Sequence, residues 1–376
     1  MPITSPNLSE LHAWLRLTLE PGLGAVSAKN LLMRFGLPEA IFEAKMVDLG
    51  SIVGEKMALQ LKAPCSEQIQ SHIDKTLVWL EQDDHHILTL ADQYYPKPLL
   101  DTHDPPVLLY VDGQLAVFEK LAMAIVGTRN ATLGGEQNAR AFGKYIAQQD
   151  WCVVSGLAQG IDGAAHEGAL SSGKEAATVA VMGTGINRIY PAHHRDLALR
   201  IKHQGALVTE YPLDTRAQPF QFPARNRIVA GLSKGVVVVE AAQQSGSLIT
   251  ARMAGEIGRE VFAIPGSIHS PVSRGCHQLI RQGAKLVETG QDIIEELGYL
   301  VSNKAPQPDE LSKKGNIPIE FRRILDMIGF DATPLTVIQQ SLGLSDAELS
   351  TTLMNMELQG LLVRLADGRY QQVHGE

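Results

Sequence analysis

The chain has 376 residues, 44% of them hydrophobic and 20% charged, and this length predicts two or three soluble domains of roughly 100–200 residues each. The longest apolar runs, such as residues 236–239, are too short to span a membrane, and the first residues lack the basic and apolar regions of a secretory signal, so we expect a cytoplasmic protein. The net charge of −8 does not exclude nucleic acid as a ligand, because residues 124–232 hold 11 Lys and Arg against 8 Asp and Glu.

Residues 1–78 predict a small all-α domain of the SAM-like, helix-hairpin-helix type. A helical pattern with leucines on one side opens at Ser5-Pro6, and proline is well placed in a first helical turn. The stretch PGLGAVSAKNLLMRFG that follows is typical of a helix-hairpin-helix turn. Gly22 and Gly24 could offer backbone N–H groups to phosphate, with Lys29 nearby, but such a turn can equally serve only to pack two helices together.

Residues 79–298 predict a Rossmann-like domain with a doubly wound α/β fold. From residue 124 to 289 an apolar stretch, a glycine or small polar residue and a longer amphipathic segment follow one another repeatedly. The apolar stretches predict strands at 121–127, 150–156, 177–183, 205–211, 234–240, 260–266 and 285–288. Because they are apolar almost throughout, they suit a mostly parallel sheet that is buried on both faces. Segments such as 137–148 and 248–258 are long enough for crossover helices.

The polar, proline-containing segment at 299–316 predicts a linker, and residues 317–376 predict a winged-helix domain. This winged-helix domain is expected to contain a helix, a turn, a second helix and a hairpin with its turn at Asp367-Gly368.

The expected second helix of this winged-helix domain, residues 345–359, is acidic. It contains Asp346, Glu348 and Glu357, and no Lys or Arg occurs between Arg323 and Arg364. Helices that read DNA insert basic or amide side chains into the major groove. We therefore expect this domain to contact protein, or the rest of the chain, and not to read duplex DNA.

Glycines and small polar residues follow the predicted strands, and ligands of parallel sheets bind outside the carboxyl ends of the strands. They include Gly127-Thr128-Arg129, Ser155-Gly156 with Gly160, Gly183-Thr184-Gly185, Ser245-Gly246-Ser247 and Pro265-Gly266. Glycine permits close approach of the backbone, and N–H groups at the following helix start bind anions. Turns between strands and helices often need glycine in any case, but five such loops at one edge predict a polar binding rim.

Two stretches add cations to this rim. Arg129 stands at a strand end, where it could bind phosphate through two hydrogen bonds or form a surface ion pair. In the stretch FPARNRIVAGLS, residues 222–233, two arginines flank an asparagine at the start of a helical run, and Phe220 and Phe222 come just before them. Cations beside exposed aromatic rings suit single-stranded nucleic acid. The residues alone leave open whether the two rings pack in the core instead.

Enzyme and metal motifs are weak. Asp162 and His166 could share a helix face, but no third ligand and no nucleophile accompany them, so we expect a helix-capping Asp and a structural or phosphate-facing His. The three cysteines, Cys65, Cys152 and Cys276, stand far apart, which favours reduced thiols over a disulfide or a zinc site. No P-loop motif is present, and the GxGxxG pattern is incomplete. We expect no catalytic residue, no cofactor and no metal.

Six motifs in collinear order closely resemble the bacterial DNA-processing protein A family (DprA, also called Smf). They are AIVGTRNATLGG, VVSGLAQGIDGAAHEGAL, VAVMGTGINRIYP, FPARNRIVAGLS, VVVVEAAQQSGSLITARMAGEIGREVFAIPG and GCHQLIRQGAKLV. Together with the preceding stretch DQYYPKPLLDTHDPPVLLYVDG they cover about residues 90 to 290. The resemblance implies a recombination mediator and not an enzyme. Such a protein binds and protects incoming single-stranded DNA during natural transformation and loads RecA recombinase onto it.

The resemblance also implies the DNA-binding residues. They are Gly127, Thr128, Arg129, Ser155, Gly156, Gly183, Gly185, Asn187, Phe222, Arg225, Asn226, Arg227, Ser245 and Gly246. Relatives often carry a lysine after the pair that is Tyr190-Pro191 here, where this chain has Ala192; either Arg195 substitutes for that cation or the affinity is lower. Proteins of this kind form homodimers through the sheet domain, and the expected interface is the late helix with His277, Leu279 and Ile280.

The competing hypothesis is an enzyme. A related glycine-rich α/β fold carries the nucleotide phosphoribohydrolases of the lysine decarboxylase-like group, which have a PGGxGTxxE signature. The stretch QSGSLITARM keeps Thr250 but has Met253 where the signature glutamate would fall. Without that carboxylate, an oxocarbenium-like state is hard to stabilise and water is hard to activate. A third hypothesis, a sequence-specific regulator that uses the winged-helix domain, is disfavoured by the acidity of that domain.

Overall fold

The computed structural model describes residues 8–298, 318–328, 332–342, 346–365 and 367–373. These residues divide into two compact units, one within residues 1–131 and 138–290 and the other within residues 132–137 and 291–376. The predicted linker at 299–316 and the expected helix start at Ser5-Pro6 lie outside the described residues. The domain limits drawn from the sequence, including the one between residues 78 and 79, stay a prediction.

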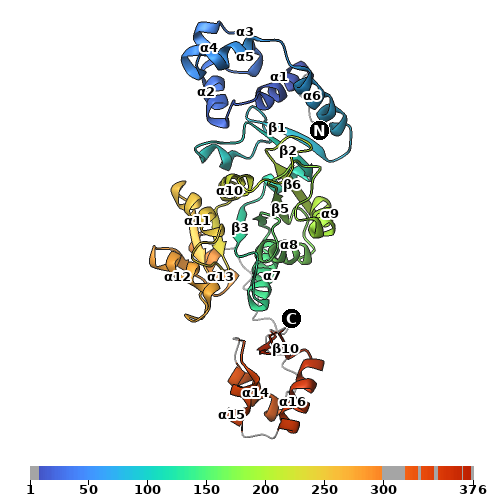
Figure 1. The fold of residues 1–376 in the computed structure, drawn as a ribbon, viewed down its shortest axis with the longest axis vertical. Helices are drawn as coiled ribbons and strands as arrows, with labels where there is room; N and C mark the ends of the chain where they lie inside the picture. The colour runs from blue at the N-terminus through green and yellow to red at the C-terminus, as the bar shows by residue number, and fades with distance from the viewer. Residues whose placement is uncertain (1–7, 299–317, 329–331, 343–345, 366, 374–376) are drawn as a thin grey trace. The chain divides into compact units, whose positions relative to one another are not determined.

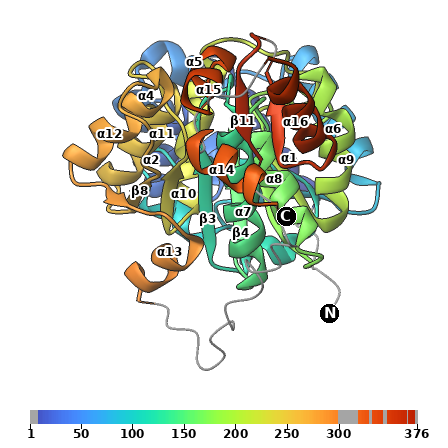
Figure 2. The same cartoon turned by 90° about the horizontal axis from the view of Figure 1, so that it is seen from below.

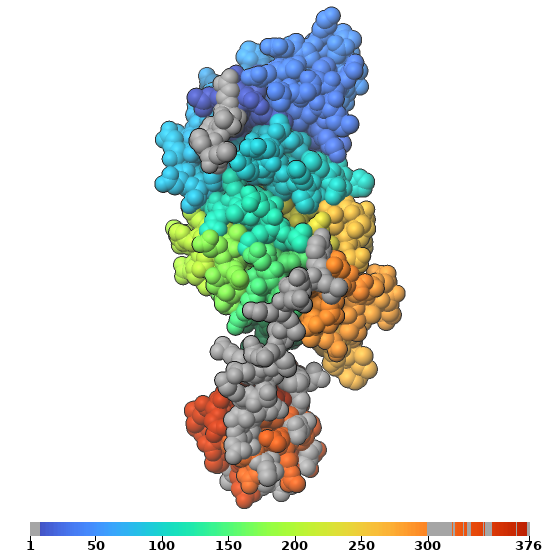
Figure 3. Space-filling model, turned by 180° about the vertical axis from the view of Figure 1, so that it is seen from behind, coloured from blue at the N-terminus to red at the C-terminus, as the bar shows by residue number. Residues whose placement is uncertain are grey.

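The N-terminal part of the first unit is helical, as predicted. It consists of α1 (Leu8–Leu19), α2 (Ala25–Phe35), α3 (Pro38–Glu43), α4 (Met46–Val53), α5 (Glu55–Lys62) and α6 (Glu67–Leu80) (Figure 1). Leu15, Leu31 and Ile73 are fully buried in a core that continues into residues of the adjoining sheet, such as Leu108 and Tyr110. Figure 3 shows the blue helices in direct contact with the cyan segment that follows them.

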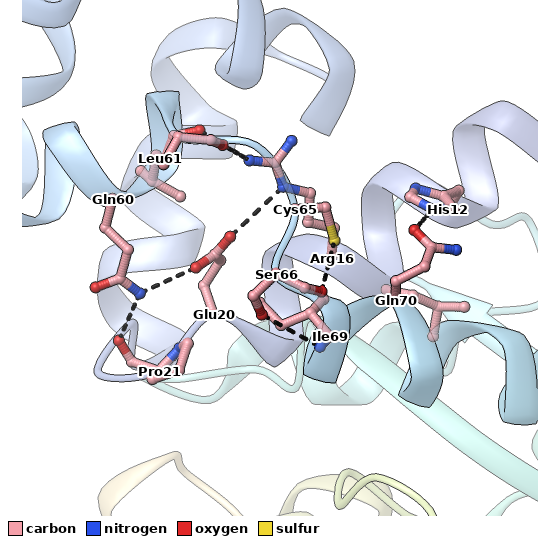
Figure 4. Close-up of polar contacts among 12 residues, drawn as sticks. His12, Arg16, Glu20, Pro21, Gln60, Leu61, Cys65, Ser66, Ile69 and Gln70 are labelled. Carbon is pink, nitrogen blue, oxygen red and sulfur yellow. Dashed lines mark hydrogen bonds and ion pairs between the residues drawn. The ribbon is translucent and has the colours of Figure 1, made fainter.

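The turn between α1 and α2 is held by hydrogen bonds to α5 (Figure 4). The Nε2 of Gln60 donates to the carbonyl oxygen of Pro21 at 3.0 Å and to Oε2 of Glu20 at 2.9 Å. Two helices joined by a turn are therefore present here, and the helix-hairpin-helix motif and its contact with DNA stay predictions. The Nζ of Lys29, which sequence analysis placed near phosphate, donates to the carbonyl oxygen of His103 at 3.4 Å.

A sheet of nine strands in the order β1-β2-β6-β5-β4-β3-β7-β8-β9 forms the centre of the first unit. The strands are β1 (His85–Thr89), β2 (Leu108–Gly113), β3 (Ala122–Val126), β4 (Cys152–Ser155), β5 (Thr178–Val181), β6 (Gly205–Thr209), β7 (Gly235–Val238), β8 (Glu260–Ala263) and β9 (Lys285–Leu286). Strands β3 to β9 pair in parallel, which confirms all the predicted strands and the mostly parallel sheet. Sequence analysis missed β1 and β2, an antiparallel pair that adds to the edge at β6.

Helices cover both faces of this sheet. They are α7 (Leu133–Gln148), α8 (Ile161–Ser171), α9 (Arg195–Gln204), α10 (Gln221–Leu232), α11 (Ser247–Glu256) and α12 (Arg274–Arg281), with short 3-10 helices η1 (Lys97–Asp101), η2 (Leu115–Phe118), η3 (Ala192–His194) and η4 (Pro271–Ser273). All but the first residue of α13 (Gly290–Glu296) belongs to the second unit. Helices α10 and α11 lie on one side of β3, and α8 and α9 lie on the other (Figures 1 and 2). Alternate strand residues such as Val181, Val236 and Val238 pack toward α10 and α11. This arrangement confirms the doubly wound fold.

The second unit contains the predicted winged-helix elements. They are α14 (Ile319–Ile328), α15 (Leu335–Leu342), α16 (Asp346–Leu358) and the antiparallel hairpin of β10 (Leu362–Arg364) and β11 (Tyr370–Gln372), around a core that includes Ile338 and Leu353. Sequence analysis expected two helices before the hairpin, and the described residues hold three, because α15 is a short helix in the stretch taken as a turn. The expected acidic helix corresponds to α16. In the part of the chain that the structure describes, no helix is both long and apolar enough to cross a bilayer.

Candidate nucleic-acid interface

A pocket of about 410 Å³ opens where the carboxyl ends of β3 and β7 meet. The chain leaves β3 toward β4 and leaves β7 toward β8, in opposite directions along the sheet, and ligands of doubly wound folds bind at such a switch point. The predicted DNA-binding residues that line the pocket are Gly127, Arg129, Gly156, Phe222, Arg225, Asn226, Ser245 and Gly246. The other predicted residues, Thr128, Ser155, Gly183, Gly185, Asn187 and Arg227, are not in its lining.

Three helices begin at this pocket. Its lining includes Asp162 in the first turn of α8, Phe222 in the first turn of α10 and Ser247 at the start of α11. The N-terminus of a helix carries a partial positive charge and backbone N–H groups that lack helical partners. Their convergence makes the pocket favourable for an anion such as a phosphate group.

Arg129 supplies a cation at the pocket that is free to bind a ligand. Its side chain is exposed, and within the described residues its guanidinium group makes no hydrogen bond and no ion pair. The Cζ atom lies 5.5 Å from the ring centroid of Phe222, which also lines the pocket. This distance is within the range of a cation–π interaction, so the ring orients the guanidinium group without neutralising it.

Arg225 is the opposite case, because only 4% of it is exposed. Its guanidinium group donates to the carbonyl oxygens of Gly156 and Val181, at the ends of β4 and β5. A Cβ on Gly156 would overlap this guanidinium group, so the glycine is required for the close approach. The Nε of Arg225 donates to Oδ1 of Asn226 at 3.2 Å, and Nδ2 of Asn226 reaches the carbonyl oxygen of Gly246 at 3.4 Å. Arg225 thus ties two strand ends to the start of α11, and its direct contact with DNA stays a prediction.

Asp162 orders the loop after β4. Its Oδ2 accepts hydrogen bonds from the backbone N–H of Gly156 at 3.1 Å and of Ala158 at 3.4 Å. These amides belong to the loop, and α8 has Gly160 at its N-cap with no side-chain cap, so the expected helix-capping role is wrong. Burial raises the pKa of Asp162, and the charge of Arg225 together with these hydrogen bonds opposes the rise. Between the two anchors, the buried Leu157 has a φ of 58°, a conformation that a non-glycine residue adopts only under constraint.

His166 is structural. It is fully buried between α8 and β5, where its Nδ1 lies 2.7 Å from Oγ1 of Thr178, and it does not line the pocket. Burial lowers the pKa of His166 to about 3, helped by the charges of His194 and Arg225, so the ring is neutral at physiological pH. Of the two expected roles, the structural one fits. In the described part of the chain, no cluster of three or more His, Cys, Asp or Glu side chains could hold a metal ion.

The predicted residues outside the pocket lining have other partners. The hydroxyl group of Ser155 donates to the carbonyl oxygen of Ile125 at 2.6 Å, and Nδ2 of Asn187 donates to Oδ1 of Asp214 at 3.1 Å. Gly183 lies beneath the ring of Phe222, where a Cβ would come within 2.9 Å of the ring atom Cδ1. Whether these residues also touch DNA stays a prediction.

Arg227 is held by two carboxylates. Its terminal nitrogens donate to both oxygens of Glu210 at 2.7 Å, and its Nε donates to Asp104 at 2.8 Å, in a second cavity of about 270 Å³. Burial acts to lower the pKa of Arg227, but the hydrogen bonds and charges of the two carboxylates raise it above its ordinary value. Because its charge is compensated within the protein, Arg227 has less positive charge to offer a phosphate than Arg129 has.

The expected dimer residues lie on α12. Leu279 and Ile280 pack partly against the sheet core, and Nε2 of His277 lies 3.0 Å from the carbonyl oxygen of Gly266. Their role in pairing two copies stays a prediction. The predicted polar rim included Ser247, which lines the pocket, but sequence analysis did not place Thr250 there, although its position in the first turn of a helix after a glycine-containing loop was the signal that could have found it.

Known proteins resemble the chain over most of its length. The family model described as DNA recombination-mediator protein A matches residues 86–298, and the DprA winged helix domain matches residues 304–368. The chain is 41% identical over 304 residues to Protein Smf of Escherichia coli, covering 79% of this chain and 80% of that protein.

Two solved structures agree with this assignment. DNA processing protein A of Streptococcus pneumoniae matches with a TM-score of 0.65 and 36% identity, over 75% of this chain and 95% of its own. DNA processing protein A of Helicobacter pylori, for which a single-stranded DNA binding mode is described, matches with a TM-score of 0.52 and 30% identity, over 57% of this chain and 96% of its own.

Proposed function

Because the chain belongs to the DNA recombination-mediator protein A family, we propose that it binds single-stranded DNA at the pocket between β3 and β7. It protects the strand without turning it over, and it loads RecA recombinase onto that strand during natural transformation. It acts in the cytoplasm as a homodimer that pairs through α12 of the sheet domain.

The observation that carries the proposal is the unpaired guanidinium group of Arg129 beside the ring of Phe222, in a pocket where three helices begin. A single strand presents phosphates, which need cations and N–H donors, and unstacked bases, which need an aromatic face. In duplex DNA the base faces are stacked on one another, so the ring of Phe222 has no partner there. The arrangement therefore favours the single strand.

The same geometry supports binding over hydrolysis. Among the described residues that line the pocket, Asp162 is the acidic one, and its carboxylate is buried and committed to two backbone N–H groups. Met253, at the position of the phosphoribohydrolase glutamate, lines the cavity of Arg227 instead. A general base for water is thus missing from this part of the structure.

The test measures the binding of labelled oligodeoxythymidine and of duplex DNA of equal length. In a separate reaction, the protein is incubated with AMP to test for hydrolysis. We expect the single strand to bind at least about tenfold more tightly than the duplex. The logarithm of the affinity should fall linearly with the logarithm of the salt concentration. AMP should remain intact. Equal affinity for both DNA forms would contradict single-strand binding, and release of adenine from AMP would favour the phosphoribohydrolase hypothesis.

A further inference from the structure

Two exposed aromatic side chains do not belong to the pocket lining but are connected to Phe222, which does. They are Tyr190, in the loop after β5, and Phe220, two residues before Phe222 in the chain, with exposed fractions of 49% and 70%. The ring centroid of Tyr190 lies 5.3 Å from that of Phe222, with an angle of 41° between the rings. The aromatic surface at the pocket therefore extends beyond the one ring that lines it.

The backbone that carries both rings is held by hydrogen bonds. Before Tyr190, the hydroxyl group of Thr184 donates to the carbonyl oxygen of Arg188, whose own N–H donates to Gly185 at 2.9 Å. Phe220 precedes the buried Gln221 and accepts a hydrogen bond from the N–H of Ala224 at its carbonyl oxygen, at 3.4 Å. Because the backbone on either side is already ordered, less conformational entropy is lost when a nucleobase stacks on each ring.

The ring faces of Tyr190 and Phe220 are accessible to a ligand. A flat, unpaired nucleobase is the occupant that fits, because Phe222 joins the ring of Tyr190 directly to the pocket and to the guanidinium group of Arg129. A strand whose phosphates enter that pocket carries its bases past these rings.

We propose that Tyr190 and Phe220 extend Phe222 into an aromatic ledge (these three residues) that stacks the unpaired bases next to the bound phosphates. The inference rests on the proposed function and adds to it a base-binding subsite. Gly183 supports the ledge from below, because the space left by its missing Cβ holds the ring of Phe222. The hydroxyl group of Tyr190 plays no part, since stacking uses the ring face.

The experiment compares oligodeoxythymidine with an abasic deoxyribose-phosphate oligomer of the same length. Stacking is worth about 1–3 kcal/mol per base, so Tyr190→Ala and Phe220→Ala should each weaken oligodeoxythymidine binding about 5- to 150-fold. Their affinity for the abasic oligomer and their salt slope should stay unchanged, because no phosphate contact is lost. Tyr190→Phe should bind like the wild type, and Phe220→Leu should lose affinity although it keeps an apolar side chain.

The matched control is Tyr94→Ala, which removes an exposed tyrosine, 36% exposed, that lines neither cavity of the site. It should bind both oligomers like the wild type. Unchanged oligodeoxythymidine binding by Tyr190→Ala and Phe220→Ala would overturn the ledge, and so would an equal loss for the two oligomers, which would indicate a distorted pocket. A wild-type protein that binds neither oligomer would overturn the proposed function itself, which separates the two failures.

Discussion

The free energy of unfolding of the Arg225→Met variant, measured by urea denaturation at pH 7, is expected to be about 4 kcal/mol lower than that of the wild type. Removing one charge from a buried pair typically costs about 3–5 kcal/mol, because the remaining charge stays buried without compensation. Here the substitution removes the donors to the carbonyl oxygens of Gly156 and Val181, and it leaves the buried carboxylate of Asp162 without the nearby positive charge. Methionine fills a similar volume, so lost packing contributes little.

The pH dependence separates this electrostatic account from a general loss of packing. Because burial raises the pKa of Asp162 above its ordinary value of 3.8, the folded protein binds this proton more tightly than the unfolded chain does. The stability that follows is present at low pH and is lost as the pH rises through the raised pKa. Arg225 opposes the rise, so its removal raises the pKa of Asp162 further, and the deficit of the variant should grow as the pH increases.

A second substitution tests the same coupling. Asp162→Asn keeps an acceptor oxygen for the N–H of Gly156 and removes the charge. We expect Arg225→Met with Asp162→Asn to be more stable at pH 7 than Arg225→Met alone. If the losses in unfolding free energy of the two single variants simply add in the double variant, this role of Arg225 is contradicted. The same holds if the loss in Arg225→Met does not change with pH.

The Arg129→Ala variant is expected to fold normally and to bind single-stranded DNA about 10- to 100-fold more weakly, because a hydrogen bond to a charged group is worth about 1.5–3 kcal/mol. The slope of log affinity against log salt should decrease in size by about 0.7, the value for one phosphate neutralised on a single strand. Both effects follow from the exposed guanidinium group, whose charge no carboxylate of the described residues compensates. Fluorescence anisotropy over a salt series measures both.

Two controls accompany this measurement. Arg252→Ala removes an exposed arginine of α11 that lines a different cavity, so its affinity and salt slope should match the wild type. Arg129→Lys keeps the charge but not the paired donors, so it should keep the slope and lose part of the affinity. An Arg129→Ala protein with unchanged affinity and slope would remove Arg129 from the site.

The sequence predicts the parallel strands β3 to β7 well because each is buried on both faces and is soon followed by a small or polar residue. Of the two strands it missed, β2 does show this pattern, since residues 108–111 are apolar and Gly113 ends the strand. Strand β1 begins with the polar pair His85-His86, and β2 pairs with it as an antiparallel addition at the edge of the sheet, outside the alternation of strands and helices. Helix α15 was missed because eight residues carry too little periodicity to separate a short helix from a turn.

The position of the pocket could be predicted, but the surroundings of Arg129, Arg225 and Arg227 could not. The glycine-rich loops after β3 and β7 indicate the edge of the sheet at which the pocket lies, because parallel strands end on the same side. The burial of Arg225 depends on carbonyl oxygens 69 and 44 residues away, and the pairing of Arg227 depends on Asp104, 123 residues earlier. Local patterns contain no information on such distant partners. The exposure of Phe220, which sequence analysis left open, likewise depends on tertiary packing.

The most direct test of the central claim is a crystal structure of the protein with bound oligodeoxythymidine. The account predicts a backbone phosphate within hydrogen-bonding distance of Arg129, in the pocket between β3 and β7, and a thymine base against the ring of Phe222. A strand bound to another surface, with this pocket empty or filled by a mononucleotide, would contradict it.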